Sequence, residues 1–169
     1  MKLILSDRPV SLFIENSSIK FVDLSSLRIS NCIGCFGCWT KTPGKCVIRD
    51  DAVSVYPAIA QSKEVIYISR VCYGGYDTIM KTMLERSIPV QQAFIRLLHG
   101  ETHHVQRRVA MKKATVMAYG VTDEEEKELF RNLIMRNASN MNFKEYKILF
   151  VEEEDLETVL KKEIRGWGK

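Results

Sequence analysis

The sequence predicts an α/β protein with a doubly wound sheet of five parallel strands. Five short segments rich in Val and Ile alternate with segments of helical periodicity, which is the order of a βαβ protein. Most of these five segments are continuous apolar runs, typical of parallel strands covered on both faces. The 169 residues contain no repeats and no low-complexity linkers, so we expect a single domain over residues 1–169.

The five strands are placed by their apolar runs and by the polar residues that bound them. They are predicted at residues 2–5 (KLIL), 19–23 (IKFVD), 64–69 (EVIYIS), 114–120 (ATVMAYG) and 145–151 (EYKILFV). Helices are expected between them, since capping residues stand where a helix can begin. The expected starts are residues 50–51, Asp77, Thr122 with Glu125 three residues later, and Asp155; Pro89 and Gly166 mark two of the ends.

Composition and charge exclude several functional classes. The net charge is +4 and no run of like charges is longer than four residues, so nucleic-acid binding is not indicated. No apolar run approaches the ~20 residues of a membrane span, and Asp7 and Arg8 come too early for a signal peptide. We therefore expect a cytoplasmic protein without membrane contact. The sequence has no nucleophile elbow, Walker loop or G-x-G-x-x-G motif.

The loops at the carboxyl ends of the strands are where ligands of such sheets bind. The third strand leads into SRVCYGGYD (69–77) and the fourth into YGVTDEE (119–125). Only residues 6–18 separate the first two strands, close to the minimum for a parallel crossover. We expect Ser6 or Asp7 to cap one short helical turn near Pro9, without room for a glycine-rich phosphate loop and a full helix.

Four of the five cysteines form a compact motif with the spacing C-x2-C-x2-C-x7-C: Cys32, Cys35, Cys38 and Cys46. Glycines between them allow a short loop to turn each sulfur toward one centre. The spacing leaves three interpretations open: a cysteine-ligated iron–sulfur cluster, a zinc site, or reduced thiols with a structural or redox role. In a reducing compartment such a cluster of cysteines favours metal or redox chemistry over structural disulfides.

The segments CIGCFGCWTKTPGKCVIRDD (32–51) and SRVCYGGYDTIMKTMLER (69–86) together resemble the NADPH-dependent FMN reductase family and, within it, the iron–sulfur flavoproteins. The resemblance is strongest from residue 29 to about residue 89. It implies a flavodoxin-like fold, FMN at the strand carboxyl ends, a 4Fe–4S cluster on the four cysteines, and NAD(P)H as a possible co-substrate. By the same analogy we expect a homodimer or homotetramer in which a neighbouring subunit covers the flavin.

The resemblance also implies which residues contact the flavin. In the family the loop after the third strand wraps the ring, so Tyr73 is expected to stack on it, and the two glycines after Tyr73 are expected to let the backbone approach and present amides. The family's second ring contact lies in the loop after the fourth strand, and Tyr119 and Gly120 match it by position only. The implied flavin contacts are Ser69, Val71, Cys72, Tyr73, Gly74, Gly75, Tyr119 and Gly120.

The first crossover departs from the family pattern. Family members carry a Gly-Ser-Pro-Arg type loop that grips the FMN phosphate, and residues 6–18 contain no glycine. Asp7 adds a negative charge where the phosphate would lie. We therefore expect FMN to be held weakly, with little preference over riboflavin.

The sequence thus predicts a flavodoxin-like FMN-dependent oxidoreductase or electron-transfer protein. Two alternatives remain open: a flavodoxin-like binding protein without a cofactor, and a thiol or metal sensor that uses residues 32–46. His99 and His103 are four residues apart, as helical metal ligands would be, but Gly100 weakens a helix there. We expect these histidines, together with His104, to be solvated on a connecting segment. Arg107 and Arg108 are expected to be solvated surface charges.

Overall fold

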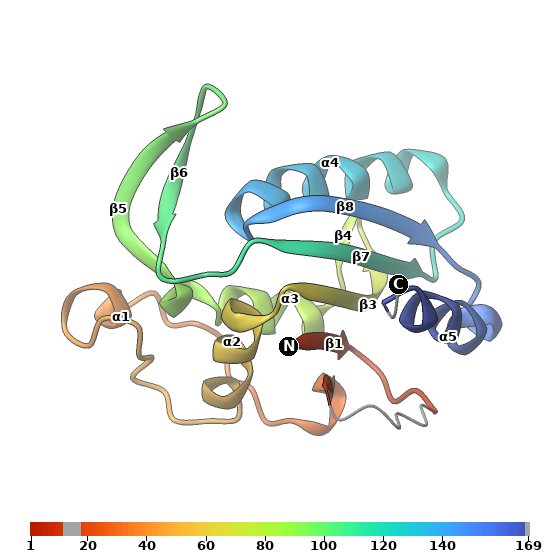
Figure 1. Cartoon of the computed structure of the whole chain (residues 1–169), viewed down its shortest axis with the longest axis horizontal. Coiled ribbons are helices and arrows are strands. Elements are labelled where there is room, and N and C mark those ends of the chain that lie inside the picture. The colour runs from red at the N-terminus through yellow and green to blue at the C-terminus, as the bar shows by residue number, and fades with distance from the viewer. Residues whose placement is uncertain (12–17, 168–169) are drawn as a thin grey trace.

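The computed structural model describes residues 1–11 and 18–167, and it has a central sheet of five parallel strands (Figure 1). The strands lie in the order β2-β1-β3-β7-β8, which corresponds to the flavodoxin-like order 2-1-3-4-5 for the parallel strands. Their bounds are β1 Lys2–Ser6, β2 Ile19–Asp23, β3 Glu64–Cys72, β7 Lys112–Tyr119 and β8 Phe143–Phe150. The predicted fold class is therefore confirmed.

Helices cover both faces of this sheet. Alternate strand residues such as Leu3 and Val65 pack with α2 (Ala52–Gln61), α3 (Thr78–Glu85) and α4 (Glu124–Asn140) on one face. Ile4 and Ile66 point to the opposite face and pack with α5 (Leu156–Gly166). The remaining short elements are η1 Leu24–Ser26, α1 Gly37–Thr40, η2 Ile88–Val90 and η3 Glu153–Asp155. Within the described chain, no helix is both long and apolar enough to cross a membrane.

The predicted helix starts hold with one correction. Asp77 caps α3, because its carboxylate accepts a hydrogen bond from the Ile79 amide at 3.1 Å. The expected capping box at Thr122 is wrong by one residue. Asp123 is the N-cap of α4, and its carboxylate accepts from the Glu126 amide at 2.8 Å. The helix begins after Asp123 because the Asp123 side chain accepts a hydrogen bond from the third amide of α4.

A hairpin of β5 (Gln91–Leu98) and β6 (Glu101–Gln106) stands away from the central sheet, and the sequence did not predict it (Figure 1). Its two-residue turn has φ values of 52° at His99 and 80° at Gly100, as a type I′ turn requires. The expectation of solvated histidines is wrong for His103, which is only 7% exposed. The hairpin packs His103 against α4, where its Nδ1 lies 3.0 Å from Asn140 Oδ1.

Lys112, the first residue of β7, is buried, and among the described residues it has no carboxylate partner. It is 1% exposed, and its ammonium donates to the carbonyl oxygens of Ala110 at 2.7 Å and Met141 at 3.4 Å. Burial lowers the pKa of Lys112 to about 8. Because the unfolded chain keeps this proton up to about pH 10.4, the unfolded state binds more protons than the folded state between the two values.

The Lys112→Met variant should remove this pH dependence. In the parent we expect the free energy of unfolding to rise between about pH 8 and pH 10.4 by an amount on the order of 3 kcal/mol, and the variant should be more stable than the parent at pH 7. Urea unfolding at several pH values measures the slope. Lys113→Met is the matched control, because that side chain is 64% exposed. Equal slopes for the parent and Lys112→Met would contradict the assignment.

Candidate functional site

The chain reverses tightly at the carboxyl end of β3. Cys72 pairs with Gly75 of the short strand β4 (Gly75–Tyr76), so Tyr73 and Gly74 form a two-residue turn. Their φ values are 51° and 69°, as in a type I′ turn. A Cβ atom on Gly74 would lie 2.7 Å from Leu129 Cβ on α4, so both the backbone conformation and the packing require glycine there.

Tyr73 is held in a left-handed conformation while its side chain is fully exposed, at 101%. This conformation costs about 1–2 kcal/mol for a residue with a Cβ atom, and the ring gains no burial in return. A strained, exposed aromatic residue at a strand carboxyl end indicates a binding role. The Gly74 amide, by contrast, is not available to a flavin, because it already donates to Glu126 Oε1 at 3.0 Å.

A groove of about 770 Å³ runs from this turn along α3 and α4 to the hairpin. Of the implied flavin contacts, Cys72, Tyr73, Gly74 and Gly75 line it; Ser69, Val71, Tyr119 and Gly120 do not. Val71 is 3% exposed and belongs to the core below the turn. The structure therefore brings together one half of the predicted ring site.

Asp7 directly follows β1 at the carboxyl ends of the strands, where it contacts β3 and β7. It is buried, and its carboxylate accepts from the Arg70 amide at 2.7 Å and from the Tyr119 hydroxyl at 2.9 Å. Burial raises the pKa of the Asp7 carboxyl above its ordinary value, although these hydrogen bonds act in the opposite direction. Burial also raises the pKa of the Tyr119 phenol, and the neighbouring Asp7 adds to this effect. The Tyr119 hydroxyl is thus already engaged in a hydrogen bond to Asp7.

The other polar groups at the start of the first crossover are also engaged. The Ser6 hydroxyl donates to the Arg8 carbonyl at 2.7 Å, and Arg8 forms an ion pair with Glu153. The Arg8 guanidinium also lies 5.4 Å from the centre of the Tyr119 ring. Over residues 6–8 the Ser6 hydroxyl and the Arg8 guanidinium are therefore already engaged, and Asp7 adds one carboxylate. The rest of the expected helical turn, residues 12–17, lies outside the described residues.

The four clustered cysteines line one small apolar cavity of about 30 Å³, together with Ile48 and Ile88. Cys32 and Cys35 are exposed, Cys38 is buried and Cys46 is half-buried. Burial raises the pKa of the Cys38 thiol, and the nearby Cys46, Cys32 and Cys35 sulfurs raise it further. All five cysteines of the chain are free thiols.

The four clustered thiols lie near one another, but the structure does not group them as a single-ion site. Among the residues that the structure describes, no three His, Cys, Asp or Glu side chains are grouped as ligands of one metal ion. A four-iron cluster is larger than an ion, so its ligands lie farther apart around a common cavity. Soft thiolates in an apolar pocket are the ligands that iron–sulfur clusters take. The donor set is therefore compatible with such a cluster, and two of its thiols, Cys32 and Cys35, are open to solvent.

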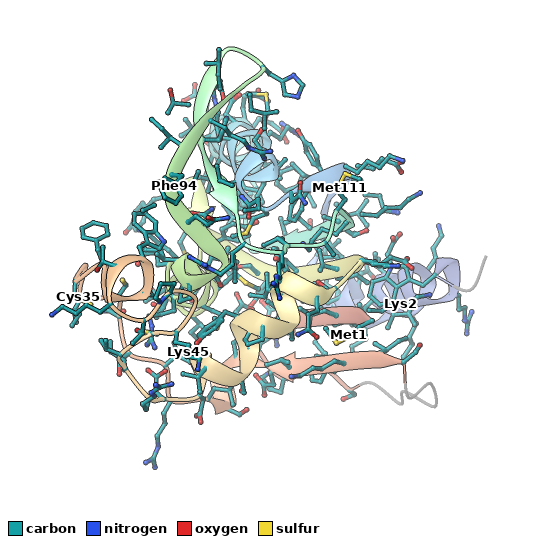
Figure 2. The ribbon with its side chains drawn as sticks, turned by 60° about the vertical axis from the view of Figure 1, so that its left-hand side comes forward. Met1, Lys2, Cys35, Lys45, Phe94 and Met111 are labelled. Atoms are coloured by element: carbon teal, nitrogen blue, oxygen red, sulfur yellow. The ribbon has the colours of Figure 1, made fainter. Side chains whose placement is uncertain are left out.

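The cysteine loop lies at the end of the sheet where the parallel strands begin, near the hairpin (Figure 1). Figure 2 shows Cys35 and Lys45 on this loop, with Phe94 of the hairpin above them. Trp39, the residue after Cys38, donates through Nε1 to the Ile88 carbonyl at 3.2 Å. Because Ile88 follows α3 and Tyr73 precedes it, the cysteine loop and the glycine turn lie at opposite ends of this helix. The helix has 8 residues, a length of about 12 Å.

Trp39 and His104 connect the cysteine loop to the groove. Trp39 was not predicted to have a role, and His104, expected to be solvated, is half-buried. Their rings lie 4.6 Å apart between centroids. His104 Nδ1 lies 3.0 Å from the Gln92 carbonyl oxygen, which only accepts, so Nδ1 carries the proton. His104 also lines the groove. Without a prediction of the hairpin, no sequence signal could place His104 next to a cysteine loop more than fifty residues away.

The fold and the groove define the class as flavodoxin-like α/β proteins. The solved structures with this fold include an FMN-dependent NADH-azoreductase from Bacillus anthracis in complex with FMN, at TM-score 0.56 and 9% identity, covering 96% of this chain and 94% of that one. Azoreductase AzrA matches at TM-score 0.58 and 9% identity, covering 99% of this chain and 95% of that one. At this identity the likeness establishes the fold alone.

The sequence relatives are more specific. The chain is 31% identical over 80 residues to an iron–sulfur flavoprotein of Methanocaldococcus jannaschii, covering 47% of this chain and 40% of that protein. It is 37% identical over 78 residues to an iron–sulfur flavoprotein of Archaeoglobus fulgidus, covering 45% and 34%. The resemblance to iron–sulfur flavoproteins is therefore confirmed, although the match spans well under half the length of either relative. No family model matches the chain.

The Tyr73→Gly variant tests two effects of the Tyr73 side chain, one on stability and one on flavin binding. Relief of the left-handed tyrosine should raise the free energy of unfolding by roughly 0.5–1 kcal/mol. Loss of the ring should weaken flavin binding by about 2- to 12-fold, since aromatic stacking contributes about 0.5–1.5 kcal/mol. Urea unfolding and a flavin fluorescence titration measure the two effects. His99→Gly, at the type I′ turn of the hairpin, is the control and should change stability alone. Unchanged flavin affinity in Tyr73→Gly would contradict the placement of Tyr73 at the flavin ring.

Proposed function

We propose that this protein is a flavodoxin-like redox protein that binds FMN beside the turn at Tyr73 and a 4Fe–4S cluster on its four clustered cysteines. The observation that carries the proposal is the groove, which begins at the turn and ends at His104. The His104 ring contacts Trp39 in a tilted arrangement, and Trp39 is next to Cys38 in the chain. A flavin in the groove and a cluster on the cysteines would be linked by this pair of rings, at a separation set by the length of α3.

At the flavin end the chain supplies position and electrostatics. FMN, when bound, accepts and donates the electrons. Tyr73 provides an exposed ring for stacking, and Gly75 leaves the backbone open, with no side-chain atom nearer than 3.9 Å to its Cβ position. Lys81 and His104 line the same groove and supply hydrogen-bond donors and acceptors to a polar ring edge. The source of the electrons is proposed to be NAD(P)H or an external one-electron donor that reaches the cysteine loop.

A homodimer or homotetramer is part of this proposal. The hairpin carries three exposed apolar side chains on one strand: Phe94 at 71%, Ile95 at 65% and Leu97 at 76%. Ile95 and Leu97 are two residues apart and share one face of the strand, and exposed apolar side chains placed together favour burial in an interface. The groove borders the same hairpin, so a neighbouring subunit seated there would also shield a bound flavin from water. Light scattering at several protein concentrations tests the oligomeric state.

A thiol or zinc sensor is the second candidate, because Cys32 and Cys35 are exposed and open to solution reagents. One anaerobic purification decides between the candidates. Flavin absorption together with iron and acid-labile sulfide supports the redox protein. Stoichiometric zinc in a colourless protein supports the sensor. A protein that takes up neither flavin nor metal on reconstitution would reject both and favour the binding protein without a cofactor.

The four cysteines should act as one set. Replacing any one of Cys32, Cys35, Cys38 or Cys46 with Ala should remove most of the iron from protein reconstituted with iron and sulfide under anaerobic conditions. Cys72→Ala is the matched control, since Cys72 lies on the groove and not on the cysteine cavity. Iron and sulfide analysis per chain gives the result. If the parent protein binds no stoichiometric iron, the cluster proposal fails.

Asp7 should set the preference between FMN and riboflavin. We expect the parent to bind the two flavins with similar affinity, because the carboxylate opposes the phosphate. Asp7→Asn should tighten FMN by ~10-fold, the effect of removing one like charge at the edge of the site, and leave riboflavin unchanged. Fluorescence titrations of both proteins with both flavins measure this. A parent that binds FMN a thousandfold more tightly than riboflavin would reveal a phosphate site elsewhere.

A further inference from the structure

Arg86 is the largest fully buried side chain of the described residues, and it stands directly after α3. Its guanidinium faces Asp50 as a two-pronged ion pair. Nη1 donates to Asp50 Oδ2 at 2.6 Å and Nη2 donates to Oδ1 at 2.9 Å. Paired hydrogen bonds of this kind fix orientation as well as charge. Burying an unpaired guanidinium costs folding free energy, so Asp50 must stay next to Arg86 in the folded chain.

The same guanidinium holds both flanks of the cysteine loop. On the side before the cysteines, Nη1 donates to the Ser30 carbonyl at 2.6 Å. On the side after them, Nη2 donates to the Ile48 carbonyl at 3.4 Å. Asp50 closes the ring of contacts by accepting from the Ser30 amide at 2.8 Å. The loop that contains all four clustered cysteines is therefore clasped at its base by one side chain.

Arg86 also reaches one of the four sulfurs. Nη2 lies 3.5 Å from Cys46 Sγ and donates to it. The Nε atom of Arg86 is buried and has no hydrogen-bond partner among the described residues. A buried cation beside a sulfur stabilises the sulfur when it carries negative charge. In a thiolate-ligated cluster, reduction adds negative charge, so such a donor favours the reduced form.

We propose that Arg86 is a positioning residue for the cysteine set: it clasps the loop and, through its hydrogen bond to Cys46 Sγ, makes the midpoint potential of the bound cluster less negative. This inference rests on the proposed cluster, but the clasp can be tested without it. The clasp predicts that the loop is ordered by Arg86 before any metal is bound. The hydrogen bond predicts an effect on the one-electron couple in which a chemical reductant such as dithionite supplies the electron.

Arg86→Lys is the informative variant. It keeps a positive charge opposite Asp50, so the fold is retained, but a single ammonium cannot reach Ser30, Ile48 and Cys46 together. Reconstituted Arg86→Lys should hold less than half of the parent's iron, and its remaining cluster should titrate at a more negative potential. Arg49→Gln is the matched control, since Arg49 is exposed and three residues from Cys46. It should match the parent in both measurements.

Hydrogen exchange of the apoprotein tests the clasp alone. Amides of residues 30–50 should exchange ~10-fold faster or more in Arg86→Lys than in the parent, from the loss of charge-assisted hydrogen bonds. Iron content and potential equal to the parent's would overturn the role at the cluster. If the parent itself binds no iron, the cluster function fails and the clasp is judged on exchange; equal exchange rates would then overturn it as well.

Discussion

The buried ion pair between Arg86 and Asp50 is the interaction on which the arrangement of the candidate site depends. Burial alone would raise the pKa of Asp50, but the hydrogen bonds from Arg86 and from the Ser30 amide lower it to about 2. An unfolded aspartate has a pKa of about 3.9, so the pair contributes its full stability above that pH and loses it as the pH falls toward 2. At neutral pH the cysteine loop is therefore fastened to the end of α3 by two fixed charges.

Because the cysteine loop is attached to its end, α3 fixes the position of this loop relative to the turn at Tyr73. Its first turn follows the strained turn at Tyr73, and its end carries Arg86 and leads into Ile88, which lines the cysteine cavity. The hairpin completes the connection, since His104 borders the groove and its ring contacts that of Trp39. A rigid helix of fixed length keeps the two ends at a constant separation, which electron transfer between bound groups would require. The central sheet positions α3 through its buried methionines Met80 and Met83.

The elements that were predicted from the sequence are those whose signal is local. All five parallel strands were found because continuous Val- and Ile-rich runs are required wherever both faces are buried. The hairpin was missed because its first strand buries neither face: the adjacent Phe94 and Ile95 are both exposed, so no alternation marks it. At the site, the sequence placed the glycine turn and the cysteine motif. It could not show that Glu126 occupies the Gly74 amide, because that contact joins residues 52 positions apart.

Two local features work against folding or against the expected ligand, and both lie at the carboxyl edge of the sheet. Tyr73 holds an unfavourable backbone conformation with an exposed ring, and Asp7 is a buried carboxylate in the crossover where the family resemblance leads one to expect a phosphate loop. Natural sequences break local rules mainly at functional sites, where a gain in binding offsets the cost. For Tyr73 such a gain is available from ring stacking. For Asp7 the hydrogen bonds to Tyr119 and to the Arg70 amide are the gain, because they join β1, β3 and β7 at the edge where the turn begins. The first residues of the crossover thus form a rigid end of the sheet, and in the proposed function ring stacking at Tyr73 is the main contact that the described chain offers to a flavin.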